Sequence, residues 1–240
     1  MKDLVASARS LLDFNLNSTQ LIALQRFENE LISWNQRSNL TAIREKEQIR
    51  VKHFLDSLTC LRVMKEPVGK VIDVGTGAGF PGLPLKIVFP GMHLTLVESV
   101  GKKVEFCQHI VQQLGLENVE IIQDRAEALG HIAKHRQQYD WALARAVAIM
   151  PVLSEYLLPL VKVGGTMLAM KGENAHSETH SAEYAVTILG GHLRKIIPIT
   201  LPGVVEERHL VVIDKIAATP ATYPRRIGLP SKHPLHSKKI

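Results

Sequence analysis

The chain of 240 residues is 45% hydrophobic and 22% charged with a formal net charge of +6, which is ordinary for one soluble globular domain with at most a small appendage. Its apolar runs are interrupted by charged residues and fall well short of the roughly 20 residues that span a bilayer, so we expect no membrane association. The two cysteines, Cys60 and Cys107, are too few for a disulfide framework, and we expect a cytoplasmic protein.

Residues 1–62 are predicted to form an N-terminal helical cap. Apolar side chains recur at three- and four-residue steps over 21–34, and Ser18 and Thr19 are suited to begin that helix. A second helix is predicted over 45–61, after a turn rich in Asn and Ser. The cap therefore consists of two main helices that precede the rest of the fold.

Residues 63–217 are predicted to form an α/β domain with a Rossmann-like sheet. Short β-branched runs alternate with helical stretches such as 101–114 and 150–161, which indicates a mostly parallel sheet. The last two runs are joined by a loop too short for a parallel crossover, so one strand should be antiparallel. A sheet of this kind is typical of class I methyltransferases. The predicted strands are 70–74, 93–98, 119–123, 139–144, 165–170, 192–199 and 209–214.

A glycine-rich loop follows the first predicted strand. Gly75, Gly77 and Gly79 let the backbone turn tightly and approach a ligand closely. Asp73 precedes the loop at a position where methyltransferases commonly carry an acidic residue near the methionine moiety. Glu98 ends the next strand, where a carboxylate can accept hydrogen bonds from both hydroxyls of a ribose. This arrangement favours S-adenosyl-L-methionine as the cofactor.

Two other interpretations of these features stay open. The segment Gly77-Ala-Gly79-Phe-Pro-Gly82 also fits the dinucleotide fingerprint, so an NAD(P)-dependent dehydrogenase is the alternative enzyme. A non-catalytic RNA-binding or assembly factor with a vestigial fold is the alternative class. His176 and His180 are a chance pair in the wrong order for a zinc helix, and we expect no metal.

Charged residues end two otherwise apolar strands, at Arg145 and Lys171. In open α/β sheets the chemistry lies beyond the carboxyl ends of the strands. The Asp/Asn-Pro-Pro-aromatic motif of amine methyltransferases is absent, and Cys60 and Cys107 lie in predicted helices, which argues against carbon methylation of pyrimidines. These absences favour an acceptor that attacks unaided, such as guanine N7, which needs placement rather than a general base.

Residues 218–240 are predicted to form a basic tail punctuated by prolines. The chain carries six Lys and Arg residues and no Asp or Glu from position 215 to its end, which accounts for the whole net charge. Such a segment is poor at burying itself and suited to phosphates, although a merely solvated terminus fits equally well. The six residues are Lys215, Arg225, Arg226, Lys232, Lys238 and Lys239.

The motifs, taken in order, resemble the bacterial small-subunit ribosomal RNA guanine-N7 methyltransferase G family, also called glucose-inhibited division protein B. The glycine loop alone would be a weak indication, but the pieces together extend from the first helix to the tail. They are WNQRSNLT (34–41), VKHFLDSL (51–58), VIDVGTGAGFPGLPLKIV (71–88), EERHLVVI (206–213) and YPRRIGLPSKHPL (223–235), together with Arg145 and Lys171.

The resemblance implies transfer of a methyl group from S-adenosyl-L-methionine to N7 of one guanine in 16S ribosomal RNA. The transfer would be in line and without a covalent enzyme intermediate, on the RNA or on the small ribosomal subunit, and we expect a monomer. Arg145, Lys171 and Arg208 would be catalytic, and His53, Lys171 and Arg208 would face the RNA or the reacting base. Arg225 and Arg226 in the tail are further candidate RNA contacts.

The resemblance also implies a set of cofactor-binding residues. Phe80 stands where many members of the family have Leu, and Glu98 replaces an Asp seen in some members. Both changes keep the chemical character of the side chain. With the glycine-loop residues identified above, the complete cofactor set is Asp73, Gly75, Gly77, Gly79, Phe80, Glu98, Ala126, Glu127 and Arg145.

Overall fold

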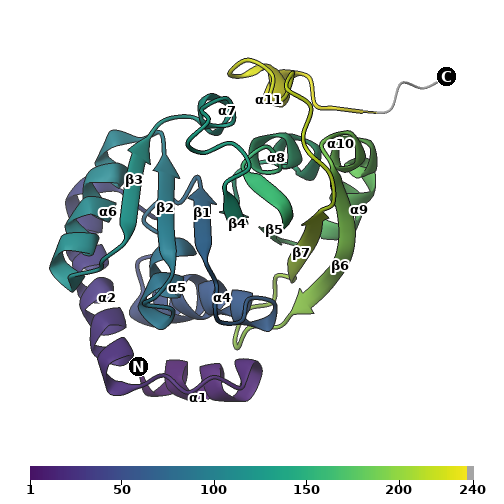
Figure 1. Cartoon of the computed structure of the whole chain (residues 1–240). Coiled ribbons are helices and arrows are strands. Elements are labelled where there is room, and N and C mark those ends of the chain that lie inside the picture. The colour runs from purple at the N-terminus through teal and green to yellow at the C-terminus, as the bar shows by residue number, and fades with distance from the viewer. Residues whose placement is uncertain (237–240) are drawn as a thin grey trace.

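A computed structural model describes residues 1–236 of the chain. Its centre is a seven-stranded twisted sheet in the order β3-β2-β1-β4-β5-β7-β6 (Figure 1). Within residues 1–236, β7 alone runs opposite to the other strands, which confirms the predicted Rossmann-like sheet with one antiparallel strand. The strands are β1 Lys70–Val74, β2 His93–Glu98, β3 Val119–Gln123, β4 Tyr139–Arg145, β5 Val161–Lys171, β6 Gly191–Ile199 and β7 Arg208–Lys215.

The fifth strand begins earlier than the sequence predicts. β5 starts at Val161 rather than at residue 165, and the preceding helix α8 (Met150–Leu157) is correspondingly shorter than predicted. Val161 pairs with Tyr139, after which the register shifts. Gly164 has a φ of 86°, a conformation that glycine adopts readily, and this permits the irregularity inside the strand.

Helices cover both faces of the sheet (Figure 1). The cap helices, α5 and α6 share one apolar core with the sheet, whereas α8 and α10 close a second core on the opposite face. None of the helices in residues 1–236 combines the length and apolar character needed to cross a membrane. The helices are α1 Lys2–Leu12, α2 Ser18–Ser38, α3 Lys46–Ile49, the π-helix η1 Arg50–Leu55, α4 Asp56–Leu58, the 3-10 helix η2 Thr59–Arg62, α5 Gly82–Val88, α6 Gly101–Leu114, α7 Ala126–Leu129, α8 Met150–Leu157, α9 Ala175–Ser181, α10 Glu183–Ile188 and α11 Leu229–Lys232.

The cap differs from its prediction at the ends of α2. Asn17, rather than Ser18 or Thr19, caps the helix, because its side chain accepts a hydrogen bond from the Gln20 backbone N–H in a capping box. The helix also continues to Ser38, which leaves a shorter turn than predicted. The second predicted helix is continuous in outline but contains the π-helical turn η1, which no sequence pattern indicated.

The C-terminal segment packs against the protein, which corrects the expectation that it buries itself poorly. Arg136 donates hydrogen bonds to the carbonyl oxygens of three residues in this segment. Lys215, counted above among the tail charges, is buried, and its ammonium donates a hydrogen bond to the carbonyl oxygen of Leu158. The basic residues Lys238 and Lys239 lie outside the described residues.

Candidate active site

A cavity of about 570 Å³ lies at the carboxyl ends of β4 and β5, beside the cap. Because β7 runs antiparallel, its first residue, Arg208, lies at this same edge, and the neighbouring His209 pairs with Lys171 in the sheet register. Four side chains predicted from the sequence line the cavity, namely His53, Arg145, Lys171 and Arg208. The fold therefore brings together residues that are far apart in the chain.

Arg145 ends β4 and reaches back to the cap, with its side chain 16% exposed. Its Nη1 donates hydrogen bonds to Asp56 Oδ2 at 2.8 Å and to the Lys52 carbonyl oxygen at 3.0 Å, and its Nη2 lies 3.1 Å from His53 Nδ1. Ala146, the next residue, has a φ of 55°, which is strained for a residue with a side chain and recurs at functional sites. The guanidinium is thus held by several bonds at once.

His53 belongs to the π-helical turn η1 and is 8% exposed. Its ring stacks on Phe80 at a centroid distance of 4.5 Å, and its Nε2 lies 2.9 Å from Thr41 Oγ1. Burial and the neighbouring Arg145 lower the pKa of His53 to about 3, so the ring is neutral at neutral pH. His53 borders the cavity, but most of its surface contacts protein, which leaves less of it for RNA than we expected.

Lys171 and Arg208, the other two predicted cations that line the cavity, differ in their partners. Lys171 Nζ lies 2.6 Å from Glu178 Oε2 and donates a hydrogen bond to the carbonyl oxygen of Ala148 at 2.9 Å. Arg208 is half-buried and donates to the carbonyl oxygen of Glu207, and it forms no ion pair within residues 1–236. Arg208 is therefore the more available cation for an outside anion.

The carboxylates that pair with these cations were not among the predicted site residues. Asp56 stands 89 positions before its partner Arg145 in the chain, so no local spacing connects them. An acidic residue three positions after His53 in the same helix is the weak pattern that could have identified it. Glu178 carried no pattern that relates it to Lys171.

The glycine loop leaves β1 at the same edge of the sheet. Gly75, Gly77 and Gly79 have φ values of 69°, 62° and 90°, all in the left-handed region that favours glycine. Glu98 accepts hydrogen bonds from the backbone N–H groups of Gly77 at 3.0 Å and Val100 at 2.9 Å. A Cβ at Gly77 would meet no atom within 4 Å, so the loop backbone borders open space there. A ligand can approach the bare backbone at this point.

Asp73 lies fully buried beneath the loop. Its Oδ2 accepts hydrogen bonds from the Thr76 hydroxyl at 2.6 Å and from the Gly82 N–H at 2.8 Å. Its Oδ1 is buried and has no hydrogen-bond partner in residues 1–236, and burial raises the pKa of the carboxyl to about 6. A cationic partner would compensate this charge. S-adenosyl-L-methionine carries an ammonium group, so the residues present fit the predicted cofactor.

Three other predicted cofactor residues have buried side chains. Phe80 is stacked between His53 and Phe27, with its ring centroid 5.1 Å from that of Phe27. Ala126 begins α7, and Glu127 accepts a hydrogen bond from the backbone N–H of Gly228 in the C-terminal segment at 3.0 Å. These contacts give the three residues packing roles, and contact with the cofactor stays a prediction for each.

The two tail arginines have different surroundings. Arg225 forms a bidentate pair with Glu155, whose side chain is fully buried, with the closest N–O distance 2.7 Å. This pair anchors the segment to α8, and contact of Arg225 with RNA stays a prediction. Arg226 is exposed. Of the two candidate RNA contacts, the structure leaves Arg226 accessible.

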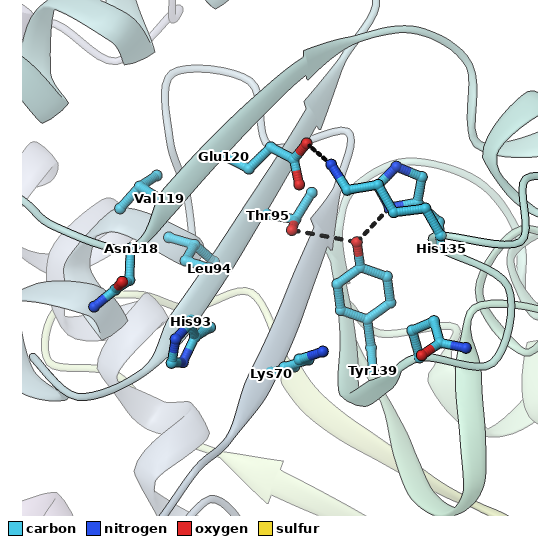
Figure 2. A pocket seen from close by; sticks show the side chains of 11 residues that line it. Lys70, His93, Leu94, Thr95, Asn118, Val119, Glu120, His135 and Tyr139 are labelled. Carbon is cyan, nitrogen blue, oxygen red and sulfur yellow. Dashed lines mark hydrogen bonds and ion pairs between the residues drawn. The ribbon is translucent and has the colours of Figure 1, made fainter.

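A second cavity, of about 350 Å³, lies at the opposite edge of the sheet, where the strands begin (Figure 2). Lys70, His93 and Tyr139 line it from the first residues of β1, β2 and β4. Its central feature is the Tyr139 hydroxyl, which lies 2.7 Å from His135 Nδ1 and 3.2 Å from Thr95 Oγ1. None of the side chains predicted for the site lies among the residues that line this cavity.

Comparisons with known proteins agree with the geometry. A family model described as rRNA small subunit methyltransferase G matches residues 20–211. The chain is 48% identical over 226 residues to the ribosomal RNA small subunit methyltransferase G of Alkaliphilus metalliredigens, covering 93% of this chain and 94% of that protein. It is 49% identical over 220 residues to the protein of the same name from Roseiflexus castenholzii, covering 92% and 94%.

Solved structures with low sequence identity share the fold. TrmN from Thermus thermophilus matches with a TM-score of 0.53 at 17% identity, covering 68% of this chain and 48% of that chain. A 16S rRNA adenine-N1 methyltransferase from Catenulisporales acidiphilia matches with a TM-score of 0.52 at 12% identity, covering 63% and 86%. Family model, near full-length relatives and fold all agree, and the chain belongs to the rRNA small subunit methyltransferase G family.

Proposed function

We propose that the protein transfers a methyl group from S-adenosyl-L-methionine to N7 of a specific guanine in 16S ribosomal RNA. The observation that carries this proposal is the cavity at the carboxyl edge of the sheet, which Arg145, Lys171 and Arg208 line. Arg145 connects it to the glycine loop, because its guanidinium lies over the Phe80 ring at 5.3 Å. Membership of the family supports the substrate class, since its relatives are named as ribosomal RNA small subunit methyltransferases.

When bound, S-adenosyl-L-methionine supplies an activated methyl group on its sulfonium. In this chain Asp73 would hold the ammonium group through its free Oδ1, and Glu98 would accept hydrogen bonds from the ribose hydroxyls. Each carboxylate oxygen can accept more than one hydrogen bond, so the backbone bonds of Glu98 leave capacity for the ribose. The space beside Gly77 would let the cofactor lie directly against the loop backbone.

The protein's main contribution to the transfer is alignment. Guanine N7 presents a lone pair and has no proton to lose, so the reaction needs no general base. The guanine becomes cationic, and a positive side chain touching N7 would oppose the reaction. Arg145 and Lys171 are each paired with a carboxylate, at 2.8 Å and 2.6 Å. We therefore assign them to phosphate, guanine O6 or the cofactor carboxylate rather than to N7.

The cysteines support an acceptor other than pyrimidine carbon. Cys60 and Cys107 are both buried, and burial raises the pKa of each thiol above its usual value. A buried thiol with a raised pKa is a poor nucleophile, because the thiolate is the reactive form.

We also propose that the RNA contacts Arg208 and the exposed Arg226, and that the protein acts as a cytoplasmic monomer. The three-part division into cap (1–62), methyltransferase domain (63–217) and tail (218–240) is proposed as an organisation by role, although cap and sheet share one core.

The decisive test is transfer of labelled methyl to small ribosomal subunits and to their naked RNA, followed by nucleoside mass spectrometry. We expect 7-methylguanosine as the product. Methyl transfer to a different nucleoside would overturn the N7 assignment. Tight RNA binding without any transfer would favour the non-catalytic factor, and tight NADH binding without binding of S-adenosyl-L-methionine would favour the dehydrogenase.

A further inference from the structure

Arg145 has five N–H donors, and the protein uses three of them. Nη1 donates to Asp56 Oδ2 and to the Lys52 carbonyl oxygen, while Nη2 makes one bond to His53 Nδ1. Within residues 1–236 no acceptor is bonded to Nε or to the second hydrogen of Nη2. These two nitrogens form one edge of the planar guanidinium. An edge with two donors matches the two oxygens of a carboxylate or a phosphate.

The donors already used are all bonded to one short helical segment. Lys52 and His53 belong to the π-helical turn η1, and Asp56 begins α4 directly after it. In a regular α-helix a carbonyl oxygen is directed at an N–H group four residues later, so a π-helical turn changes which carbonyls a side chain can reach. The segment thus offers a carbonyl, a ring nitrogen and a carboxylate to the same guanidinium.

His53 can take part only in its neutral form. Arginine has donors alone, so the nitrogen that faces Arg145 must carry a lone pair, and the hydrogen of the ring lies on Nε2. Nε2 then donates to Thr41 Oγ1 at 2.9 Å, and this hydroxyl also accepts a hydrogen bond from the Ile43 backbone N–H. Thr41 therefore sets the tautomer that His53 needs toward Arg145.

We propose that His53, Asp56 and the Lys52 carbonyl are positioning groups that hold Arg145 so that its free Nε and Nη2 edge binds an oxyanion of the reactants. The oxyanion is the cofactor carboxylate or an RNA phosphate, since each presents two oxygens that can accept the two parallel hydrogen bonds of this edge. This inference rests on the proposed function. It assigns to His53 a role through Arg145 in place of direct contact with RNA.

The test is a double-mutant cycle on methyl transfer to small ribosomal subunits. His53→Leu removes the acceptor and keeps the apolar contact, and we expect kcat/KM to fall roughly 10- to 100-fold, the range for a hydrogen bond to a charged group. His53→Asn places an amide oxygen near the position of Nδ1 and should recover most of the loss. In an Arg145→Lys background, His53→Leu should cause little further loss, because the group it positions is gone.

His135→Leu is the matched control. Like His53, His135 is a buried histidine whose Nδ1 is hydrogen-bonded, but it lies at the opposite edge of the sheet. We expect this variant to lower the melting temperature and to leave kcat/KM unchanged. If the effects of His53→Leu and Arg145→Lys simply multiply, or if His53→Asn recovers nothing, the positioning role is wrong. If His53→Leu does not fold, Asp56→Asn, which keeps the shape of the side chain, replaces it in the same double-mutant cycle with Arg145→Lys.

Ligand binding distinguishes the two sources of the oxyanion and does not require turnover. S-adenosylhomocysteine has a carboxylate, and methylthioadenosine lacks the amino-acid portion. If the cofactor carboxylate is bound, His53→Leu and Arg145→Lys should weaken the first ligand roughly 10-fold and leave the second unchanged. If an RNA phosphate is bound, both ligands should bind normally, while the subunit binds more weakly with a smaller salt dependence. Normal binding of all three would overturn the inference, whereas failure of the wild-type protein to methylate guanine would overturn the proposed function.

Discussion

The two edges of the sheet each carry a cavity with a buried polar network, and the networks are built in different ways. At the amino edge, Tyr139 bonds His135, four residues away in the chain, and Thr95 on β2, which β1 separates from β4 in the sheet (Figure 2). At the carboxyl edge, Arg145 is bonded to residues 89 to 93 positions away in the cap. The first network uses neutral groups, whereas the second holds paired charges.

This difference shows which cavity is arranged for chemistry. Burying a charge costs free energy unless the charge is paired and hydrogen-bonded. A fold that gathers cations and carboxylates from several elements at one edge therefore gives up stability there. The amino-edge network satisfies polar groups where strands begin and needs no ligand.

Arg145→Gln should cause the largest loss. We expect kcat/KM to fall roughly 1000-fold, or about 4 kcal/mol, because the change removes the free donor edge and leaves Asp56 buried without its cation. Steady-state transfer of labelled methyl to small subunits measures this effect. Lys134→Gln, which breaks an exposed ion pair with Glu120 at the amino edge, is the control and should leave kcat/KM unchanged. If Arg145→Gln kept more than about a tenth of the wild-type kcat/KM, the carboxyl-edge network would not be the one arranged for catalysis.

Arg225→Gln should reduce stability rather than catalysis. The change leaves the fully buried Glu155 carboxylate unpaired, so we expect the free energy of unfolding to fall by about 3 kcal/mol in urea denaturation. Arg226→Gln, at the neighbouring exposed position, should leave stability unchanged and weaken subunit binding with a smaller salt dependence. Equal effects of the two substitutions on stability would contradict the anchoring role of Arg225.

Asp73→Asn should change stability and cofactor binding in opposite directions. The folded state holds the Asp73 proton more tightly than the unfolded chain, with a pKa of about 6 against a usual value of 3.8, so this group lowers stability as pH rises from about 4 to about 6. Asn lacks this dependence, and the variant should be more stable at pH 7 by up to about 3 kcal/mol. S-adenosyl-L-methionine should bind at least about 10-fold more weakly, because the partner of its ammonium group is lost.

Urea denaturation between pH 4 and pH 8 and titration calorimetry measure these two effects. The difference between variant and wild type isolates Asp73 from other groups that titrate in the same range, including His53. Unchanged cofactor affinity would show that the free Oδ1 does not face the ammonium group.

Tyr139→Phe should have the smallest effect. The change removes the hydroxyl that joins His135 and Thr95, and we expect the free energy of unfolding to fall by about 1 kcal/mol while kcat/KM stays the same. Thermal unfolding and methyl transfer, measured on the same preparation, check both parts. A loss of activity without a loss of stability would give the amino-edge cavity a role that its neutral network does not indicate.

The sequence by itself determined the sheet, the glycine loop and the family. Strand alternation, the short loop before β7 and the left-handed glycines depend on neighbours within a few residues, where periodicity and backbone preference act directly. The polar residues at the ends of β4 and β5 were also identifiable, because the carboxyl edge of a parallel sheet is where such side chains gather.

Only the tertiary structure decided what the individual side chains do. The structure shows that His53 bonds Arg145 and that Arg225 anchors the C-terminal segment to Glu155, two contacts that the sequence did not predict. Contact of either residue with RNA stays a prediction. In both cases the partner lies far away in the chain, and the pairing depends on burial that no local pattern reports. A charged residue in a sequence shows that a charge must be accommodated, and the fold decides whether a protein group or a ligand accommodates it.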